Sequence, residues 1–270
     1  MMSLGILVLI YGWFAGIVVN ALADDLPRRV RPELPHYPDG EPRPLLAWSA
    51  ILAFLSGYWC STAGSMLKWR HMVAEIGTIV LCLLTYTATS SRPDASDLQI
   101  IFWLLYAAIF ALITVIDMEH KLILFVVINP FVVIAILDAL LTGNQAGPQI
   151  VESLIGGAVG YGIFFLMYQG GFIFTSILGR ARGEEISEVA FGYGDVMLAG
   201  VVGLILGWKL FLFSMTFTII FGAVGAVFYL VLLRLIGSRY SAFTALPYGP
   251  YIVAGAMVMI LFPTQVGNFL

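Results

Sequence analysis

The sequence predicts an all-α polytopic membrane protein with about eight transmembrane helices, and three observations support this prediction. Hydrophobic residues make up 60% of the 270 residues and charged residues only 11%, with a mean hydropathy of +0.97. A soluble domain is typically about half apolar and a quarter charged. The apolar residues form runs of about 20, the length that crosses a hydrocarbon core roughly 30 Å thick. The longest polar stretch, residues 23–44, is too short to build a hydrophobic core of its own.

Eight apolar runs are predicted to cross the membrane. The first, residues 3–22, lacks the basic start of a signal peptide, so we expect it to be retained as an anchor. The others follow in chain order: residues 71–89, 98–116, 123–141, 151–168, 196–207, 210–233 and 247–262. A loop rich in proline and arginine, residues 24–44, follows the first run, and shorter polar turns separate most of the later ones.

The apolar segment 45–67 is predicted not to cross, because of the distribution of basic residues. Short loops rich in Lys and Arg face the cytoplasm. If this segment does not cross and the amino terminus lies outside, only Arg92 and Lys209 fall outside, so 11 of the 13 basic residues lie inside. If it crossed, every later loop would change sides and the pattern would be lost. We therefore expect a cytoplasmic loop, residues 23–71, that carries a re-entrant or interfacial segment, and a membrane domain over residues 72–270.

Two aspartates are the candidate catalytic residues. Asp195 follows Gly192 and Gly194 at the start of the run 196–207, and glycine lets backbone segments approach closely. Asp117 follows the run 98–116. The predicted topology places both carboxylates at one depth on the cytoplasmic side of the membrane, and an ionisable group at membrane depth is costly and therefore indicates function. Two neighbouring carboxyls cannot both ionise cheaply, so one can act as a base toward water while the other donates a proton.

Other interpretations of these residues are open at this stage. An aspartate that follows a transmembrane run is often a solvated helix end, and a single Gly-x-Gly-Asp pattern is weak. The pair could also serve a transporter or channel as a proton or cation site, although both residues lie at one face and not at the midplane. Asp138 and Glu152 are interpreted as structural groups at helix ends.

The composition argues against a nucleic-acid partner, and the cysteine spacing argues against a metal site or a disulfide. A net charge of −3 does not suggest nucleic acid as a partner, so the expected environment is the lipid bilayer. Cys60 and Cys82 lie in apolar segments without CxxC spacing, so we expect neither a metal site nor a disulfide.

Several motifs, in matching order along most of the chain, resemble those of the type IV prepilin peptidases, membrane aspartic proteases of the GxGD class. The central one is Gly192-Tyr193-Gly194-Asp195-Val196-Met197-Leu198 with Gly203 and Gly207-Trp208, which is similar to the family's GMGDxKLL…G…GW. Further segments resemble other family motifs: Gly156–Tyr161, Pro247–Tyr251, Gly16–Asn20 with Leu26-Pro27, and Arg70 with Glu75. These additional matches favour the prepilin branch over presenilins and signal peptide peptidases, which cut within the bilayer.

The resemblance implies an aspartic endopeptidase that removes a short basic leader from type IV prepilins and pseudopilins at the cytoplasmic face of the bacterial inner membrane. It assigns catalysis to Asp117 and Asp195, with Gly192 and Gly194 supporting the catalytic loop, and it implies no cofactor for proteolysis. The acidic loop residues Glu184, Glu185 and Glu188 would then be a solvated loop or a contact for the basic leader. An inactive family member that acts in assembly is a third alternative, and the intact aspartate pair argues against it.

The chain departs from the family pattern in its first loop. Many members have two CxxC pairs there that bind zinc, whereas this loop has Cys60 alone, so we expect no zinc. We expect packing of segment 45–67 against the membrane to take the place of the zinc. In the family this region is tied to N-methylation of the new amino terminus with S-adenosylmethionine, so the sequence leaves that activity and its cofactor open. A second departure is Leu124-Phe125, where the family often has Pro-Asp.

Overall fold

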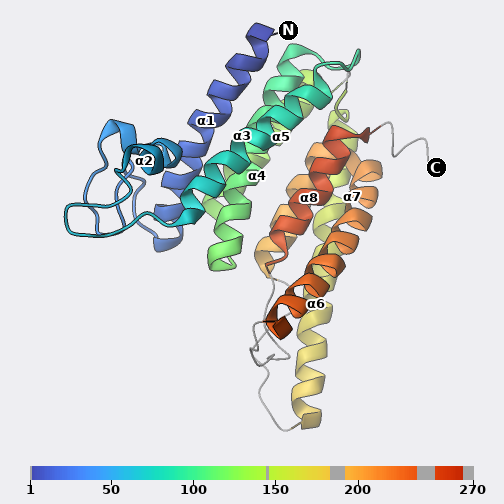
Figure 1. Ribbon diagram of the computed structural model, residues 1–270. Helices are drawn as coiled ribbons and strands as arrows, with labels where there is room; N and C mark the ends of the chain where they lie inside the picture. Colours follow the sequence, from blue (N-terminus) through green and yellow to red (C-terminus); the bar gives the residue numbers. More distant parts are fainter. Residues whose placement is uncertain (1, 144–145, 183–191, 236–246, 264–270) are drawn as a thin grey trace. The chain divides into compact units, whose positions relative to one another are not determined.

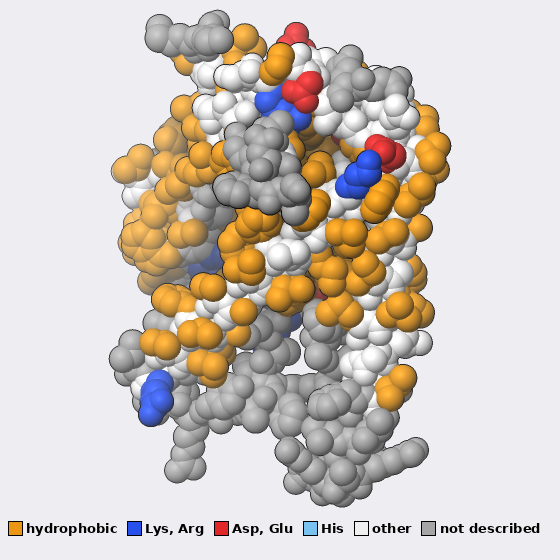
Figure 2. All heavy atoms as spheres, turned by 90° about the vertical axis from the view of Figure 1, so that its right-hand side faces the viewer, with side chains coloured by type: hydrophobic (Ala, Val, Ile, Leu, Met, Phe, Trp, Pro, Cys, Tyr) orange, Lys and Arg blue, Asp and Glu red, His pale blue; other side chains and the backbone are white. Residues whose placement is uncertain are grey.

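The computed structural model describes residues 2–143, 146–182, 192–235 and 247–263, which divide into two compact units, residues 1–120 and 121–270. Over this part of the chain the structure is all-helical, as predicted (Figure 1). Six of its helices are long and apolar enough to cross a membrane, and a shorter apolar helix lies near the carboxyl end. Figure 2 shows one face on which hydrophobic side chains predominate and charged ones are few, as expected of a surface in contact with lipid.

The first unit is built from three long helices and one short one: α1 (Met2–Asp25), α2 (Ala50–Ser56), α3 (Trp69–Thr89) and α4 (Asp97–His120). α1, α3 and α4 contact one another around a core that includes Val8, Cys82 and Ala107. α1 approaches α3 closely at Gly16, where an added Cβ would lie 2.9 Å from Cγ of Glu75. Small residues permit this close packing of helices in a membrane.

The apolar segment 45–67 does not form a transmembrane helix. It contains a 3₁₀ turn at Leu45–Ala47 and then α2, whose seven residues are about 10 Å long. The chain next makes a tight turn that is closed by a bridge between Cys60 and Met66. Within the segment no helix is long enough to span a bilayer, which agrees with the predicted topology; the position of the segment at the membrane and its contact with lipid stay predictions.

A buried carboxylate of α3 holds this segment in place. Glu75 is fully buried, and its Oε1 accepts a hydrogen bond of 2.5 Å from the Ser49 hydroxyl. Its Oε2 accepts hydrogen bonds from the backbone N–H groups of Ala50 at 2.6 Å and Ile51 at 3.3 Å. Trp13 Nε1 of α1 donates to Ser49 Oγ at 3.0 Å. Glu75 thus caps the start of α2 and ties it to α1 and α3.

Two tight turns lie side by side in the first loop. The first turn is closed by a bridge between His36 and Pro42, and the second is the turn described above, closed by the bridge between Cys60 and Met66. The Ser61 hydroxyl donates to Asp39 Oδ2 at 2.5 Å, and the backbone N–H and hydroxyl of Thr62 donate to Glu41 Oε2 at 2.9 and 2.8 Å. These hydrogen bonds join the turns directly. Cys60 contributes a single thiol to these turns, whereas a structural zinc site takes about four such ligands.

The second unit contains the remaining four helices: α5 (Phe125–Thr142), α6 (Ile150–Arg182), α7 (Tyr193–Leu235) and α8 (Gly249–Leu261). α6 extends to Arg182, beyond Tyr168, where the predicted run ends. The amino-terminal half of α6 packs against α7 through glycine. An added Cβ at Gly156 or at Gly203 would collide with the backbone of the other.

α7 consists of two helical halves that meet at Gly207, where φ of 71° and ψ of 167° are not helical. Both halves reach the same residue of α6, because an added Cβ at Gly160 would meet the backbone of Ala199 and, at 3.2 Å, the ring of Phe211. The chain therefore reverses direction at Gly207 (Figure 1). The halves correspond to the predicted runs 196–207 and 210–233. Counted separately, they bring the apolar helices of the described chain to eight, in agreement with the prediction.

Candidate active site

Asp195 lies in the first turn of α7, and its side chain is buried, with 8% of the residue exposed. The Asp195 N–H donates to the Gly192 carbonyl at 3.1 Å, and the Gly192 N–H donates back to Asp195 Oδ2 at 2.9 Å. This is the reciprocal pattern of a capping box, in which the third helical residue accepts from the N-cap N–H. The pattern fixes the orientation of the carboxylate at a helix amino terminus, where the helix dipole stabilises negative charge.

The two glycines of the Gly-x-Gly-Asp motif have different structural roles. An added Cβ at Gly194 would lie 2.7 Å from Cβ of Ile123, closer than real Cβ atoms approach. At Gly192 the nearest atom to an added Cβ would be Asp195 Oδ2 at 3.5 Å, an ordinary contact. Gly194 therefore allows a close approach, whereas Gly192 contributes the backbone N–H that holds Asp195.

Aromatic side chains surround the start of α7. The hydroxyls of Tyr193 and Tyr161 are hydrogen-bonded at 2.8 Å, and the ring of Tyr193 lies 6.0 Å from those of Phe125 and Tyr168. Tyr248, which precedes α8, is close enough to Asp195 for its hydroxyl to interact electrostatically with the Asp195 carboxylate. Tyr248 was not among the site residues predicted from the sequence, although the motif at Pro247–Tyr251 was the available signal.

Asp117 lies in the last turn of α4 and not after the helix, as the run 98–116 had suggested. It is buried, with 4% of the residue exposed. α4 ends at His120, and Lys121 then adopts a left-handed conformation with φ of 53°. Such a residue commonly terminates a helix. Asp117 is therefore a buried group close to the carboxyl end of a membrane helix.

Ion pairs fix the end of α4 that carries Asp117. Arg70, in the first turn of α3, pairs through Nε with Glu119 Oε2 at 3.1 Å and through its terminal nitrogen with Asp24 of α1. His71 Nε2 lies 3.1 Å from the other oxygen of Asp24. Because these groups are only 4–24% exposed, solvent screens them less than surface pairs. Arg70 thus joins the ends of α1, α3 and α4.

The predicted site residues occupy both units. Asp117 belongs to the first unit, and Asp195 lies in the second with Gly192 and Gly194, so the pairing of the two carboxylates stays a prediction. Asp138 is buried and accepts a hydrogen bond of 2.5 Å from Thr142, which agrees with a structural role.

The other acidic and metal-ligating candidates add no further cluster. Glu152 Oε1 lies 4.0 Å from Lys209 Nζ. The predicted leader contacts Glu184, Glu185 and Glu188 lie outside the described residues. Within the residues that the structure describes, no group of three or more His, Cys, Asp or Glu side chains is arranged to hold a metal ion.

The sequence profile of the type IV leader peptidase family matches residues 103–227, a range that contains both Asp117 and Asp195. Over this range the chain is similar to the type IV leader peptidase family. It is 24% identical to a prepilin leader peptidase/N-methyltransferase of Stutzerimonas stutzeri and 23% identical to one of Pseudomonas aeruginosa, in each case over 83% of this chain and 67% of the relative. It is 22% identical to a protein of the same name from Pseudomonas putida, over 77% of this chain and 64% of the relative.

The chain therefore spans about two thirds of the length of the curated relatives that it matches. No solved structure matches it. Its similarity to the peptidase family and its apolar helices together indicate a multi-pass membrane peptidase.

Proposed function

We propose that this protein is an aspartic endopeptidase that cleaves the short basic leader from type IV prepilin or pseudopilin precursors, at the cytoplasmic face of the bacterial inner membrane. The observation that carries the proposal is the placement of Asp117 and Asp195. Both lie in the segment that matches the peptidase family, and each is a buried carboxylate at the end of an apolar helix.

The two helix ends differ in a way that assigns the two chemical roles. Asp195 begins a helix and accepts a backbone hydrogen bond, so its environment stabilises the ionised carboxylate. Asp117 ends a helix, where the dipole disfavours negative charge. We therefore assign to Asp195 the removal of a proton from the attacking water, and to Asp117 the donation of a proton to the leaving nitrogen. Tyr248, close to Asp195, is available to orient the substrate carbonyl or the water.

The test is cleavage of a purified prepilin by the full-length protein in detergent. Cleavage is measured as the decrease in prepilin mass that corresponds to the leader. Asp117→Asn and Asp195→Asn should each reduce kcat by about a thousandfold or more. The kcat of the double variant should be no lower than that of the less active single variant, because the two carboxyls act as a unit. Asp138→Asn is the matched control, since it removes another buried carboxylate and should leave cleavage in place.

Two results would contradict this assignment. Full activity in Asp117→Asn would mean that the first carboxylate is a different residue. Cleavage by both single variants would show that the two aspartates are not a catalytic pair. The transporter alternative would then be tested by proton-driven uptake in vesicles that contain the protein.

N-methylation is not included in this proposal, although the relatives' names contain it. The first unit contains a polar pocket whose lining includes Asp24, Lys68 and Arg70. Its volume of about 110 Å³ is below the roughly 300 Å³ at which cofactor sites begin. That pocket does not fit S-adenosylmethionine, and no step of the mechanism depends on it. The mass of the cleaved product, with S-adenosylmethionine present and absent, decides whether a methyl group is added.

A further inference from the structure

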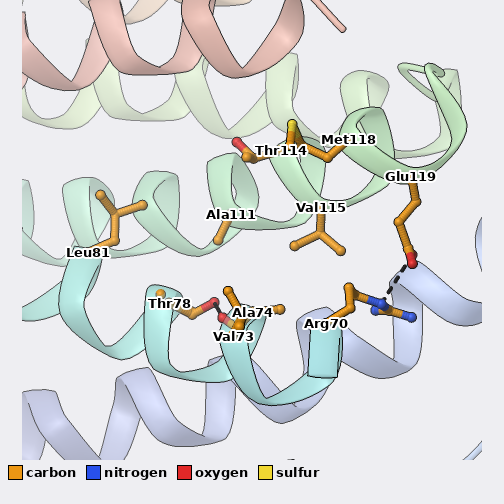
Figure 3. A pocket seen from close by; sticks show the side chains of 11 residues that line it. Arg70, Val73, Ala74, Thr78, Leu81, Ala111, Thr114, Val115, Met118 and Glu119 are labelled. Carbon is orange, nitrogen blue, oxygen red and sulfur yellow. Dashed lines mark hydrogen bonds and ion pairs between the residues drawn. The ribbon is translucent and has the colours of Figure 1, made fainter. Parts of the chain in front are cut away.

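An apolar groove runs between α3 and α4 in the first unit, and the proposed mechanism does not use it. Its volume is about 410 Å³. α3 contributes Ala74, Gly77 and Leu81 to its walls, and α4 contributes Ala111, Val115 and Met118 (Figure 3). At one end the lining changes from apolar side chains to the ion pair of Arg70 and Glu119.

A polar pocket begins at the same ion pair. It has a volume of about 110 Å³ and shares Arg70 and Glu119 with the groove. Its other charged and titratable groups are Asp24, Arg28, Tyr37, Lys68 and all three histidines of the chain, His36, His71 and His120. An apolar groove that opens into a small polar pocket is the shape that a two-part, amphipathic ligand requires.

The length of the groove agrees with the depth of one lipid leaflet. From Arg70 to Leu81, α3 rises by about 16 Å at 1.5 Å per residue. Half of a hydrocarbon core roughly 30 Å thick is about 15 Å. A lipid acyl chain that lay in the groove would therefore reach from the charged helix ends to the middle of the bilayer.

The charges of the polar pocket favour an anionic group. Arg70 already pairs with both carboxylates of the pocket, Asp24 and Glu119. Arg28 and Lys68 are exposed, and neither makes an ion pair with another residue that the structure describes. Two cations are therefore available to a ligand, and phosphate oxygens are their strong hydrogen-bonding partners. A basic peptide would be repelled by the same two side chains.

We propose that this groove and pocket form a binding site for an anionic phospholipid, with an acyl chain between α3 and α4 and the phosphate held by Arg28 and Lys68. The site goes beyond the proposed peptidase function and does not depend on it. It would attach the ends of α1, α3 and α4, and with them the turn that carries Asp117, to the lipid headgroup layer.

The experiment is native mass spectrometry of the full-length protein released from detergent, after incubation with phosphatidylglycerol or with phosphatidylcholine of the same acyl chains. We expect preferential retention of phosphatidylglycerol. The double variant Arg28→Gln/Lys68→Gln should lose that preference, at about fivefold per charge. Gly77→Leu should prevent retention, because an added Cβ at Gly77 meets no protein atom within 4 Å and a leucine side chain there would occupy the groove.

Gly162→Leu in α6 is the matched control, since Gly162 also faces open space and lies outside the groove. Equal retention of the two lipids, or undiminished phosphatidylglycerol binding in Gly77→Leu, would overturn the proposal. Full competition by inorganic phosphate would show a site for the free anion instead of a lipid. A raised KM for the prepilin in Gly77→Leu with unchanged lipid retention would show that the groove receives the apolar segment of the substrate.

Discussion

Replacing Gly194 with alanine tests how closely the start of α7 must approach the segment before α5. The new Cβ would lie 2.7 Å from Cβ of Ile123, whereas carbon atoms in contact are about 3.5–4.0 Å apart. The first turn of α7 would therefore have to move by about 1 Å. That turn carries Asp195, and a misplacement of about 1 Å can reduce a rate by about 100-fold.

The same change should cost little stability. Overpacking typically costs about 1–3 kcal/mol. Alanine recovers up to about 1 kcal/mol of this, because it favours the helical conformation more than glycine does. The net loss of at most about 3 kcal/mol should leave a folded protein whose kcat for prepilin cleavage is about 100-fold lower.

Gly192→Ala provides the matched comparison for the assay. Its Cβ would make only an ordinary contact at 3.5 Å, so the variant should lose about 0.5–1 kcal/mol from the weaker N-cap preference of alanine and keep most of its kcat. In Gly194→Ala, a second change of Ile123→Gly removes the clashing atom and should recover part of the rate. Wild-type kcat in Gly194→Ala, or equal losses in the two alanine variants, would refute the reasoning.

Three further predictions concern stability. Glu75→Gln should lower the free energy of unfolding by about 1–3 kcal/mol, because an amide cannot accept all the hydrogen bonds at the start of α2; an unchanged urea midpoint would contradict this. Gly207→Ala should cost about 1–3 kcal/mol in the same measurement, since φ of 71° with ψ of 167° is accessible essentially to glycine alone, and a variant as stable as wild type would argue against the reversal of α7. The hydrogen bond from Ser61 lowers the pKa of Asp39, so the contribution of the ionised carboxylate to stability is present above about pH 4 and is lost as the pH falls below that value. The difference in unfolding midpoint between wild type and Asp39→Asn should therefore disappear in acid. A difference that persists in acid would contradict the assignment.

The sequence by itself determined the membrane-spanning helices, because a bilayer requires long uninterrupted apolar runs and few other patterns can satisfy the backbone there. It also identified segment 45–67 as an exception, since the basic residues on both sides of it would otherwise face the wrong compartment. The GxGD motif and Asp117 were recognised from local pattern and order along the chain. These features depend on composition over short windows, which a single sequence displays directly.

Only the tertiary structure decided which atoms hold the site together. Glu75 was visible only as part of a motif, and its role at the start of α2 depends on contacts with residues 24 to 26 positions away. The reversal at Gly207 depends on a backbone conformation that glycine permits but does not require. The difference between Gly192 and Gly194 depends on the position of Ile123. Such contacts are set by packing between elements distant in sequence, and residue type alone does not encode which partner each side chain meets.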